Sequence, residues 1–348
     1  MGAYVAWVMG SGFATGQEIM QFFTCYGYKS FVLLAINLVG FLIIGPGILG
    51  AGQINRDNPE YNHFGFFCGK KLGAFYSWYL PISLFAGMVI LISGSGATLK
   101  EYFGINHYVG ALIMAILAFV SYVIGFQRFV KIVSFIGPTI IAFTVFVGIV
   151  TVVRDFDGLS QAAAVSDSMA EKQPVGQWWL AGLLYISYNL TGGSAYYSAL
   201  GATGATRREA VIGATIGTVV LMAAILLMNT AMLTDIGRTA VLDVPTLYLT
   251  KKISVTLGAV FSVILIMGIF SSCSAMMWTV CNKFVKQGTR KGIIFAACAG
   301  GVAFFMGLLP FADLIGIVYT LSGYAGFIFV GCVAYKRLKT GIDRNESV

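Results

Sequence analysis

The sequence predicts an all-α integral membrane protein with ten transmembrane helices, arranged as a 5+5 inverted repeat in which helices 1 and 6 are discontinuous. Three observations predict it. Hydrophobic residues make up 58% of the chain and charged residues only 10%, whereas soluble domains carry about 25% charged residues. Apolar runs of about 20 residues recur along the chain. Polar, glycine-rich stretches interrupt the first and sixth of these runs at mid-depth.

Ten hydrophobic segments follow one another along the sequence. Each is long enough to cross a hydrocarbon core of about 30 Å as a helix that rises about 1.5 Å per residue. Strands are not expected, because alternation with period two is absent. We expect the segments at residues 1–27, 30–55, 72–99, 107–126, 128–153, 177–201, 209–234, 253–283, 291–309 and 313–336.

Lysine and arginine predict the orientation. With the N-terminus in the cytoplasm, the inside loops hold 15 of the 22 basic residues and the outside loops hold 7. The positive-inside rule therefore places both termini in the cytoplasm of a plasma membrane, and the net charge of +8 reflects this orientation rather than nucleic acid. We expect a first five-helix repeat at 1–153, an external loop at 154–176, a second repeat at 177–336 and a cytoplasmic tail at 337–348.

Two further features narrow the class of protein. The external segment 235–252 mixes apolar and polar residues, which fits a short helix lying over an external opening. No CxxC pair occurs, so the cysteines are interpreted as small hydrophobes, and the histidines fall in loops. Nothing in the pattern indicates a cofactor, and no nucleophile–base pair lies at membrane depth, so an enzyme is not expected. The residues concerned are Cys25, Cys68, Cys273, Cys281, Cys298, Cys332, His63 and His107.

Glu18 is the only ionisable residue well inside a segment, because Asp313 and Lys131 lie at helix ends. A charge at mid-bilayer costs about 2.5–3.5 kcal/mol on insertion scales. Such a residue faces the bundle interior and is a functional candidate. The alternative is a neutral glutamate that hydrogen-bonds to a neighbouring helix.

Three glycines precede Glu18, and they admit three interpretations. A nucleotide-binding loop is excluded, because the spacing of Gly10, Gly12 and Gly16 is GxGxxxG and no strand precedes it. Gly12 and Gly16 also form a small-xxx-small pair that suits helix packing. The third interpretation is a broken helix near the membrane midplane, where the freed backbone groups bind an ion or substrate.

The sixth segment supplies the argument for a broken helix. Its sequence is WWLAGLLYISYNLTGGSAYYSALG, and its centre, Asn189–Gly193, is again polar and glycine-rich. Segments one and six are each the first of five, and an odd number of segments per repeat inverts the second repeat. We therefore expect non-helical backbone within Gly10–Gly16 and within Asn189–Gly193, with the two stretches facing each other.

The string VMGSGFATGQEIMQFF resembles the first segment of the YkvI-like family of bacterial membrane proteins. The segment number and order resemble the leucine-transporter fold of the amino acid–polyamine–organocation superfamily over essentially the whole chain. Gly10, Ser11 and Gly12 also resemble the GSG of amino acid permeases, in which backbone N–H groups bind a substrate carboxylate. The lysine that replaces sodium in proton-coupled relatives has no counterpart here, because segment five contains none beyond Lys131.

The same resemblance implies a sodium site. Sodium-coupled relatives use two adjacent hydroxyl residues of segment eight together with backbone carbonyls of segment one, and Ser271 and Ser272 match that pattern, with Ser274 nearby. The alternatives are serines that mediate helix contacts and a proton carried by Glu18.

Together these features predict a secondary transporter coupled to Na⁺ or H⁺ that moves an amino acid or related small amine by alternating access. The resemblance implies that segments one, two, six and seven rock against three, four, eight and nine. The rival function is a membrane ligand receptor of the same fold. No cofactor is expected apart from the coupling ion, and the expected partners are a small molecule and the lipid bilayer. The predicted substrate-binding residues are Gly10, Ser11, Gly12, Phe13, Gly16, Glu18, Tyr188, Asn189, Thr191, Gly192 and Gly193.

Overall fold

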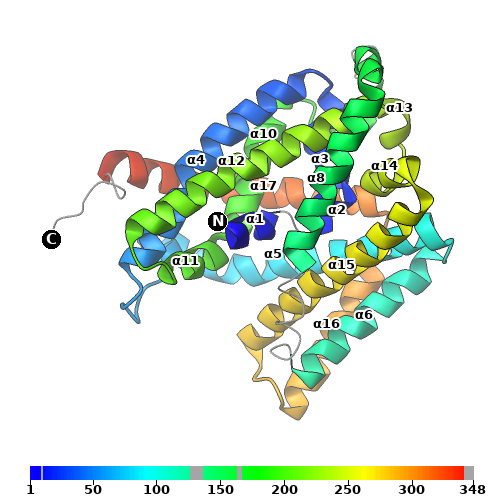
Figure 1. Cartoon of the computed structure of the whole chain (residues 1–348). Coiled ribbons are helices and arrows are strands. Elements are labelled where there is room, and N and C mark those ends of the chain that lie inside the picture. Colours follow the sequence, from blue (N-terminus) through cyan, green and yellow to red (C-terminus); the bar gives the residue numbers. More distant parts are fainter. Residues whose placement is uncertain (9–10, 126–135, 163–166, 341–348) are drawn as a thin grey trace.

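The computed structural model describes residues 1–8, 11–125, 136–162 and 167–340, and every regular element among them is helical (Figure 1). This confirms the prediction of an all-helical chain. Within the described part, seven helices are long and apolar enough to cross a membrane. They span Lys29–Ile54, His63–Phe103, His107–Ile124, Pro138–Ser160, Arg207–Leu233, Val255–Phe284 and Phe311–Lys339.

Segments two to five each coincide with a described helix: α4 (Lys29–Ile54), α5 (His63–Phe103), α6 (His107–Ile124) and α8 (Ile136–Asp155). Lys131 lies outside the described residues. The start of α5 precedes the predicted start of segment three. The reason is that α5 consists of two helices joined across a kink.

Gly69 forms the kink of α5, with φ 76° and ψ 175°, a conformation that glycine adopts without steric cost. The hydrophobic pattern marks only the longer helix after this kink, and it misses the two turns before it. Asn62 caps those turns, because its side chain accepts a hydrogen bond from the Gly65 N–H.

The second half shows the same correspondence for segments seven to ten: α12 (Arg207–Leu233), α15 (Val255–Phe284), α16 (Arg290–Met306) and α17 (Phe311–Thr340). The cytoplasmic tail was predicted to begin at residue 337, but α17 continues to Thr340. Basic residues in the last turn are favourable at this end of the helix dipole, so the helix continues into the start of the segment predicted as the tail.

Segments one and six are both divided. Segment one comprises α1 (Gly2–Val8), α2 (Ser11–Thr15), α3 (Gln17–Phe22) and a 3₁₀ turn, η1 (Thr24–Tyr26). Segment six comprises α10 (Trp178–Gly192) and α11 (Ser194–Ala202).

Short helices occupy the two long connections that are predicted to be external. The first holds η2 (Phe156–Gln161) and η3 (Asp167–Lys172), and the second holds α13 (Ile236–Thr239) and α14 (Pro245–Ile253). The expected short helix within 235–252 is therefore present.

The helices pack so that the divided segments lie between longer ones. In Figure 1, α4 runs beside α12, and α10 and α17 lie behind them; α4 contacts α10, and α10 contacts α17. α5 packs along α15, and α6 and α16 complete that side of the bundle. The buried carboxylate described below lies between α3, α10 and α17.

Arg337 illustrates how the bundle satisfies freed backbone groups. Pro46 lies inside α4 and has no N–H, so the carbonyl of Leu42, one turn earlier, loses its helical partner. The Arg337 guanidinium of α17 donates hydrogen bonds to the carbonyls of Leu42 and Ile43. A side chain near the end of α17 therefore supplies the donor that Pro46 removes from α4.

Candidate functional site

The backbone of segment one is interrupted, as predicted. α1 ends at Val8, and α3 begins after Gly16, which adopts the left-handed conformation with φ 83° and ψ −12°. Between them Ser11–Thr15 forms one short helix, so only part of the predicted stretch is irregular. The Thr15 hydroxyl donates to the Gly12 carbonyl at 2.8 Å and holds this short helix together. Gly10 lies outside the described residues.

Gly16 is a glycine for two reasons. An L side chain at this φ is strained. A Cβ would also lie 2.3 Å from Met232 Cε and 2.5 Å from Thr246 Oγ1, so α12 and α14 approach the backbone directly. The close approach of neighbouring helices and the required conformation therefore coincide at one residue.

Segment six departs from the prediction. Residues 189–192 are helical, and Gly193 has φ −81° and ψ −6°, within the right-handed region. The Gly193 N–H donates to Asn189 O at 3.0 Å, and the Tyr197 N–H donates to Gly193 O at 2.8 Å. The expected non-helical backbone within Asn189–Gly193 is thus limited to a turn at Gly193. Glycine lowers helix stability, but it does not by itself force the chain out of the helical region.

The two divided segments do meet. A Cβ on Gly193 would lie 2.5 Å from Trp7 Nε1, so the indole of α1 packs on the backbone where α10 meets α11. Trp7 also stacks on Tyr196 with ring centroids 5.2 Å apart, and Tyr4 contacts Tyr197 at 4.7 Å. The missing side chain of Gly193 therefore makes room for Trp7.

Glu18 lies at the beginning of α3, directly after the Gly16 break, with 3% of its surface exposed. The Tyr188 hydroxyl of α10 donates to Glu18 Oε1 at 2.5 Å. A Cβ on Gly12 would lie 2.6 Å from Glu18 Oε2 and 3.2 Å from the Tyr319 hydroxyl. The structure therefore brings together three predicted site residues, Gly12, Glu18 and Tyr188.

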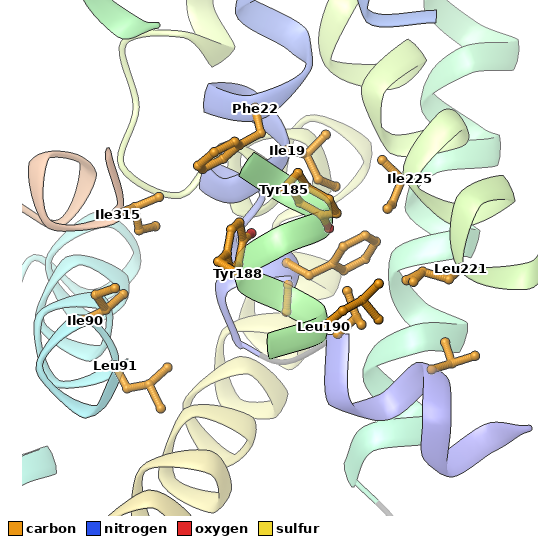
Figure 2. Close-up of a cluster of buried hydrophobic side chains, with 14 of the residues drawn as sticks. Ile19, Phe22, Ile90, Leu91, Tyr185, Tyr188, Leu190, Leu221, Ile225 and Ile315 are labelled. Atoms are coloured by element: carbon orange, nitrogen blue, oxygen red, sulfur yellow. The ribbon is translucent and has the colours of Figure 1, made fainter. Parts of the chain in front are cut away.

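Aromatic rings surround this carboxyl group. Tyr188 stacks on Tyr319 with centroids 4.4 Å apart and an interplanar angle of 12°. The ring centroids of Phe22 and Tyr185 each lie 5.4 Å from the ring centroid of Tyr188. Figure 2 shows Phe22, Tyr185 and Tyr188 together at the end of α3 that faces α10. We call Phe22, Tyr185, Tyr188 and Tyr319 the aromatic wall.

Sequence reasoning singles out Tyr188 but misses Tyr319 as part of this wall. Tyr319 lies in segment ten, within the apolar run LIGIVYTLSGY. A tyrosine in such a run was the one available signal, and it does not distinguish a site from ordinary helix packing.

Other predicted residues serve helix contacts. Phe13 is fully buried. The Asn189 side chain donates to Tyr185 O at 3.1 Å within α10, and the Thr191 hydroxyl donates to Gly326 O of α17 at 3.5 Å. A Cβ on Gly192 would meet nothing within 4 Å. Of these four residues, Asn189 also has its side chain within interaction range of the Glu18 carboxyl group.

The serines of segment eight differ in burial. Ser274 is 1% exposed, and its hydroxyl is buried without a hydrogen-bond partner, whereas Ser271 and Ser272 are half-buried. α15, which carries them, contacts α2 of segment one. The predicted contact between segments one and eight is therefore present. Of the three serines, Ser274 is the most buried, and its hydroxyl has no hydrogen-bond partner.

α14 covers the break from the predicted external side. Thr246 lies against Gly16, as its distance to the Cβ position shows. Lys252 at the other end of α14 pairs with Asp155 of α8 and with Asp235 beside α12, each at 3.1 Å. Two carboxylates thus tie α14 to the helices on either side of it.

The geometry defines a helical multi-pass membrane protein with an interrupted first segment and a buried carboxylate beside it. Two solved structures of the Eremococcus coleocola manganese transporter are similar to the chain, one of a mutant and one in complex with an aromatic bis-isothiourea substituted compound. Each has 15% sequence identity and a TM-score of 0.49, and each comparison covers 93% of this chain and 74% of the transporter.

A curated relative is similar over nearly the whole length. The chain is 25% identical over 346 residues to the uncharacterized membrane protein YkvI of Bacillus subtilis, covering 96% of this chain and 94% of YkvI. No protein-family model matches the chain. The names of these relatives describe a membrane protein and transporters, and none describes an enzyme.

Proposed function

We propose that this chain is a cation-coupled secondary transporter of an amino acid or related small amine, with the leucine-transporter fold of the amino acid–polyamine–organocation superfamily. The observation that carries the proposal is the buried Glu18 carboxyl group. It lies where segment one is interrupted, and it accepts a hydrogen bond from Tyr188 of segment six. An ionisable group at this depth, beside the break of segment one and bonded to segment six, is typical of a transport site.

The helix contacts support the proposed inverted repeat of ten helices. If segments one to five correspond to segments six to ten, each contact between two segments has a counterpart between the two corresponding segments. α5 contacts α6, and α15 contacts α16; α12 contacts α8, and α4 contacts α17. α6 contacts α15, and α16 contacts α5. These matched pairs are what two repeats related by a pseudo-two-fold axis produce.

In this mechanism α14 covers the site on the external side, and Gly16 is the point at which segment one bends. Movement of α3 against α10 would separate Glu18 from Tyr188 and open the space beside Gly12. Both termini would lie in the cytoplasm of a bacterial plasma membrane, as the distribution of basic residues indicates.

The coupling ion is either a proton on Glu18 or sodium at Ser271, Ser272 and Ser274. For sodium, we expect Ser272→Ala to raise the sodium concentration needed for half-maximal binding by about tenfold, because one hydroxyl ligand is lost, with the order of substrate preference unchanged. Thermal-shift titration with sodium at fixed pH and ionic strength measures this. Binding that is the same in sodium and potassium would exclude the sodium site.

Glu18→Gln tests the site itself. The amide keeps the size and can still accept from Tyr188, but it cannot ionise. We expect a folded variant that loses coupled transport and the pH dependence of binding, because protons no longer compete with the cation for the carboxylate. In the unsubstituted protein binding should weaken as pH falls. Wild-type transport with an unchanged pH profile in Glu18→Gln would show that Glu18 only bridges helices.

A thermal-shift screen of the purified protein against amino acids and amines, with and without sodium, identifies the ligand. Manganese belongs in the screen because the similar solved structures are of a manganese transporter. Against manganese, the described residues hold no group of three or more His, Cys, Asp or Glu side chains suited to a metal ion. Uptake of the labelled ligand into proteoliposomes then separates a transporter from the rival, a ligand receptor, which binds without moving the label.

A further inference from the structure

Glu18 is a buried carboxyl group without a basic partner. Among the described residues, Glu18 takes part in no ion pair. The neutral hydroxyl of Tyr188 donates to it, and the other side chains that interact with it, Tyr185 and Asn189, are neutral as well. An ionised carboxylate buried in this way is costly, so it either holds a proton or takes a cation as ligand.

The groups around the carboxyl are suited to an organic cation. Tyr188 reaches the carboxyl group with its hydroxyl, Tyr319 stacks on Tyr188, and Phe22 packs against Tyr188. An ammonium group bound to Glu18 therefore lies among aromatic rings, which attract cations. Hard metal ions instead require about six to eight oxygen ligands, or retain water. An aromatic wall beside one carboxylate therefore favours an alkylammonium group over a hydrated metal ion.

Gln21 adds a second acceptor on the same side of α3. Its side chain is 4% exposed, its Nε2 donates to Ala312 O of α17 at 2.7 Å, and its Oε1 has no partner. Oε1 lies 3.2 Å from the Cβ position of Gly316, one turn along α17 from Ala312 and one turn before Tyr319. Glu18 and Gln21 thus both present oxygen acceptors toward α17, and an ammonium group supplies N–H donors.

Charge balance separates an amine from an amino acid. An alkylammonium neutralises Glu18 completely. Beside an ionised Glu18, a zwitterionic amino acid leaves the buried site with one net negative charge, so it needs an additional cation, either sodium or the proton that Glu18 then retains. Burying an unbalanced charge is unfavourable, so an amine without a carboxylate is the ligand that displaces the proton and leaves the site neutral without a second cation.

Among the described residues, the titratable groups that face Glu18 are tyrosines, since Asp313 at the start of α17 is exposed. α3 packs against α2, α10, α12, α17 and η1. α2 has no ionisable residue, and the charged residues of α12 lie at its far end. In η1 the Cys25 thiol donates to Gln21 O and the Tyr26 hydroxyl donates to Val175 O. The ionisable side chains that face the carboxyl are Tyr185, Tyr188 and Tyr319.

We propose that this site exchanges one alkylammonium ion for one proton on Glu18, so that the substrate class is an organic amine without a carboxylate. In the empty site the carboxyl group is protonated and Tyr188 donates to it. The amine enters already protonated, the O–H bond of the carboxyl group breaks with its electron pair left on oxygen, and the proton goes to water. The inference deepens the proposed function, because it makes the coupling a proton exchange at the same site.

Calorimetry on the detergent-purified full chain tests the exchange. Phenethylamine is compared with phenylalanine, and isoamylamine with leucine, in sodium-free buffers of different ionisation enthalpy, because that difference reports protons released. We expect the amines to bind at least about tenfold more tightly than their amino acids, with about one proton released per amine at about pH 6. As the pH is lowered from about 8, the affinity for the amine should fall. The fall should be about tenfold per pH unit over the range in which Glu18 of the empty site is protonated.

Matched variants keep the result specific. Glu18→Gln should lose amine binding and proton release. Glu101→Gln makes the same change at a carboxyl group of α5 that accepts the Val244 N–H at 3.0 Å, away from this site, and it should keep both. The two variants should have similar melting temperatures without ligand.

Three results would overturn the exchange: equal sodium-free affinity for an amino acid and its amine, amine binding with no proton release at any pH, or no binding of either amine. Sodium-dependent binding of the amino acids alone would leave the proposed transport function in place and reject the amine. Amine binding with proton release but no uptake into proteoliposomes would support the exchange site and reject transport.

Discussion

The two glycine-rich interruptions of this chain look alike in sequence and differ in structure. In segment one the break is real, because Gly16 has φ 83° and separates α2 from α3. In segment six Gly193 keeps φ −81°, and hydrogen bonds continue from Asn189 through Gly193 to Tyr197. A glycine pair in a membrane helix therefore does not reveal whether the helix is broken there.

The neighbours of each glycine explain the difference. Gly16 lies against Met232 and Thr246, which leave no room for a side chain at a residue whose backbone is left-handed. Gly193 lies against Trp7, which needs the space but imposes no unusual backbone. The first glycine supplies a conformation, and the second supplies room for an aromatic ring.

Gly16→Ala should have the largest effect on the folded state. The left-handed backbone and the overlap with Met232 Cε and Thr246 Oγ1 each oppose a Cβ, so we expect a loss of about 2–5 kcal/mol in the free energy of unfolding. Unfolding in mixed micelles with increasing denaturing detergent measures it. A loss below about 1 kcal/mol would mean that this break is as adaptable as the turn at Gly193.

Tyr188→Phe tests the bond that joins the two interruptions. It removes the hydroxyl that donates to Glu18 and leaves the ring in place. We expect the free energy of unfolding to fall by about 1.5–3 kcal/mol. Tyr197→Phe is the matched control, because the Tyr197 hydroxyl is also buried on segment six, has no hydrogen-bond partner, and its removal should be nearly neutral or stabilising. Equal effects of the two variants in the same unfolding assay would contradict a specific Tyr188–Glu18 bond.

Gly193→Ala and Gly192→Ala make the smallest changes and sharpen the contrast with Gly16. At Gly193 the overlap with Trp7 and Tyr197 is partly offset by the better helix propensity of alanine, so a loss of about 1 kcal/mol is expected. At Gly192 nothing lies within 4 Å, and alanine should stabilise the helix by about 0.5–1 kcal/mol. If Gly192→Ala were strongly destabilising, segment six would have to leave the helical conformation in another state of the protein.

Much of the site was predictable from residue chemistry. Glu18 is identified by the cost of an ionisable group inside an apolar segment, and Gly12 and Gly16 by their spacing beside it. Tyr319 was not predictable, because its role depends on α17 lying beside α10, more than 100 positions away in sequence. Gly193 was mispredicted because sequence shows where glycine occurs and not whether its φ is positive.

The sequence by itself determined the membrane class, the approximate position of the helices and Glu18 as the carboxyl group in the middle of an apolar segment, because these follow from local composition and the cost of burying charge. Tertiary structure decided which glycine breaks a helix and which rings surround Glu18. Those outcomes depend on contacts between distant segments: Met232 and Thr246 against Gly16, and Tyr188 and Tyr319 against each other. Such contacts form only when the helices pack, and no local pattern encodes them.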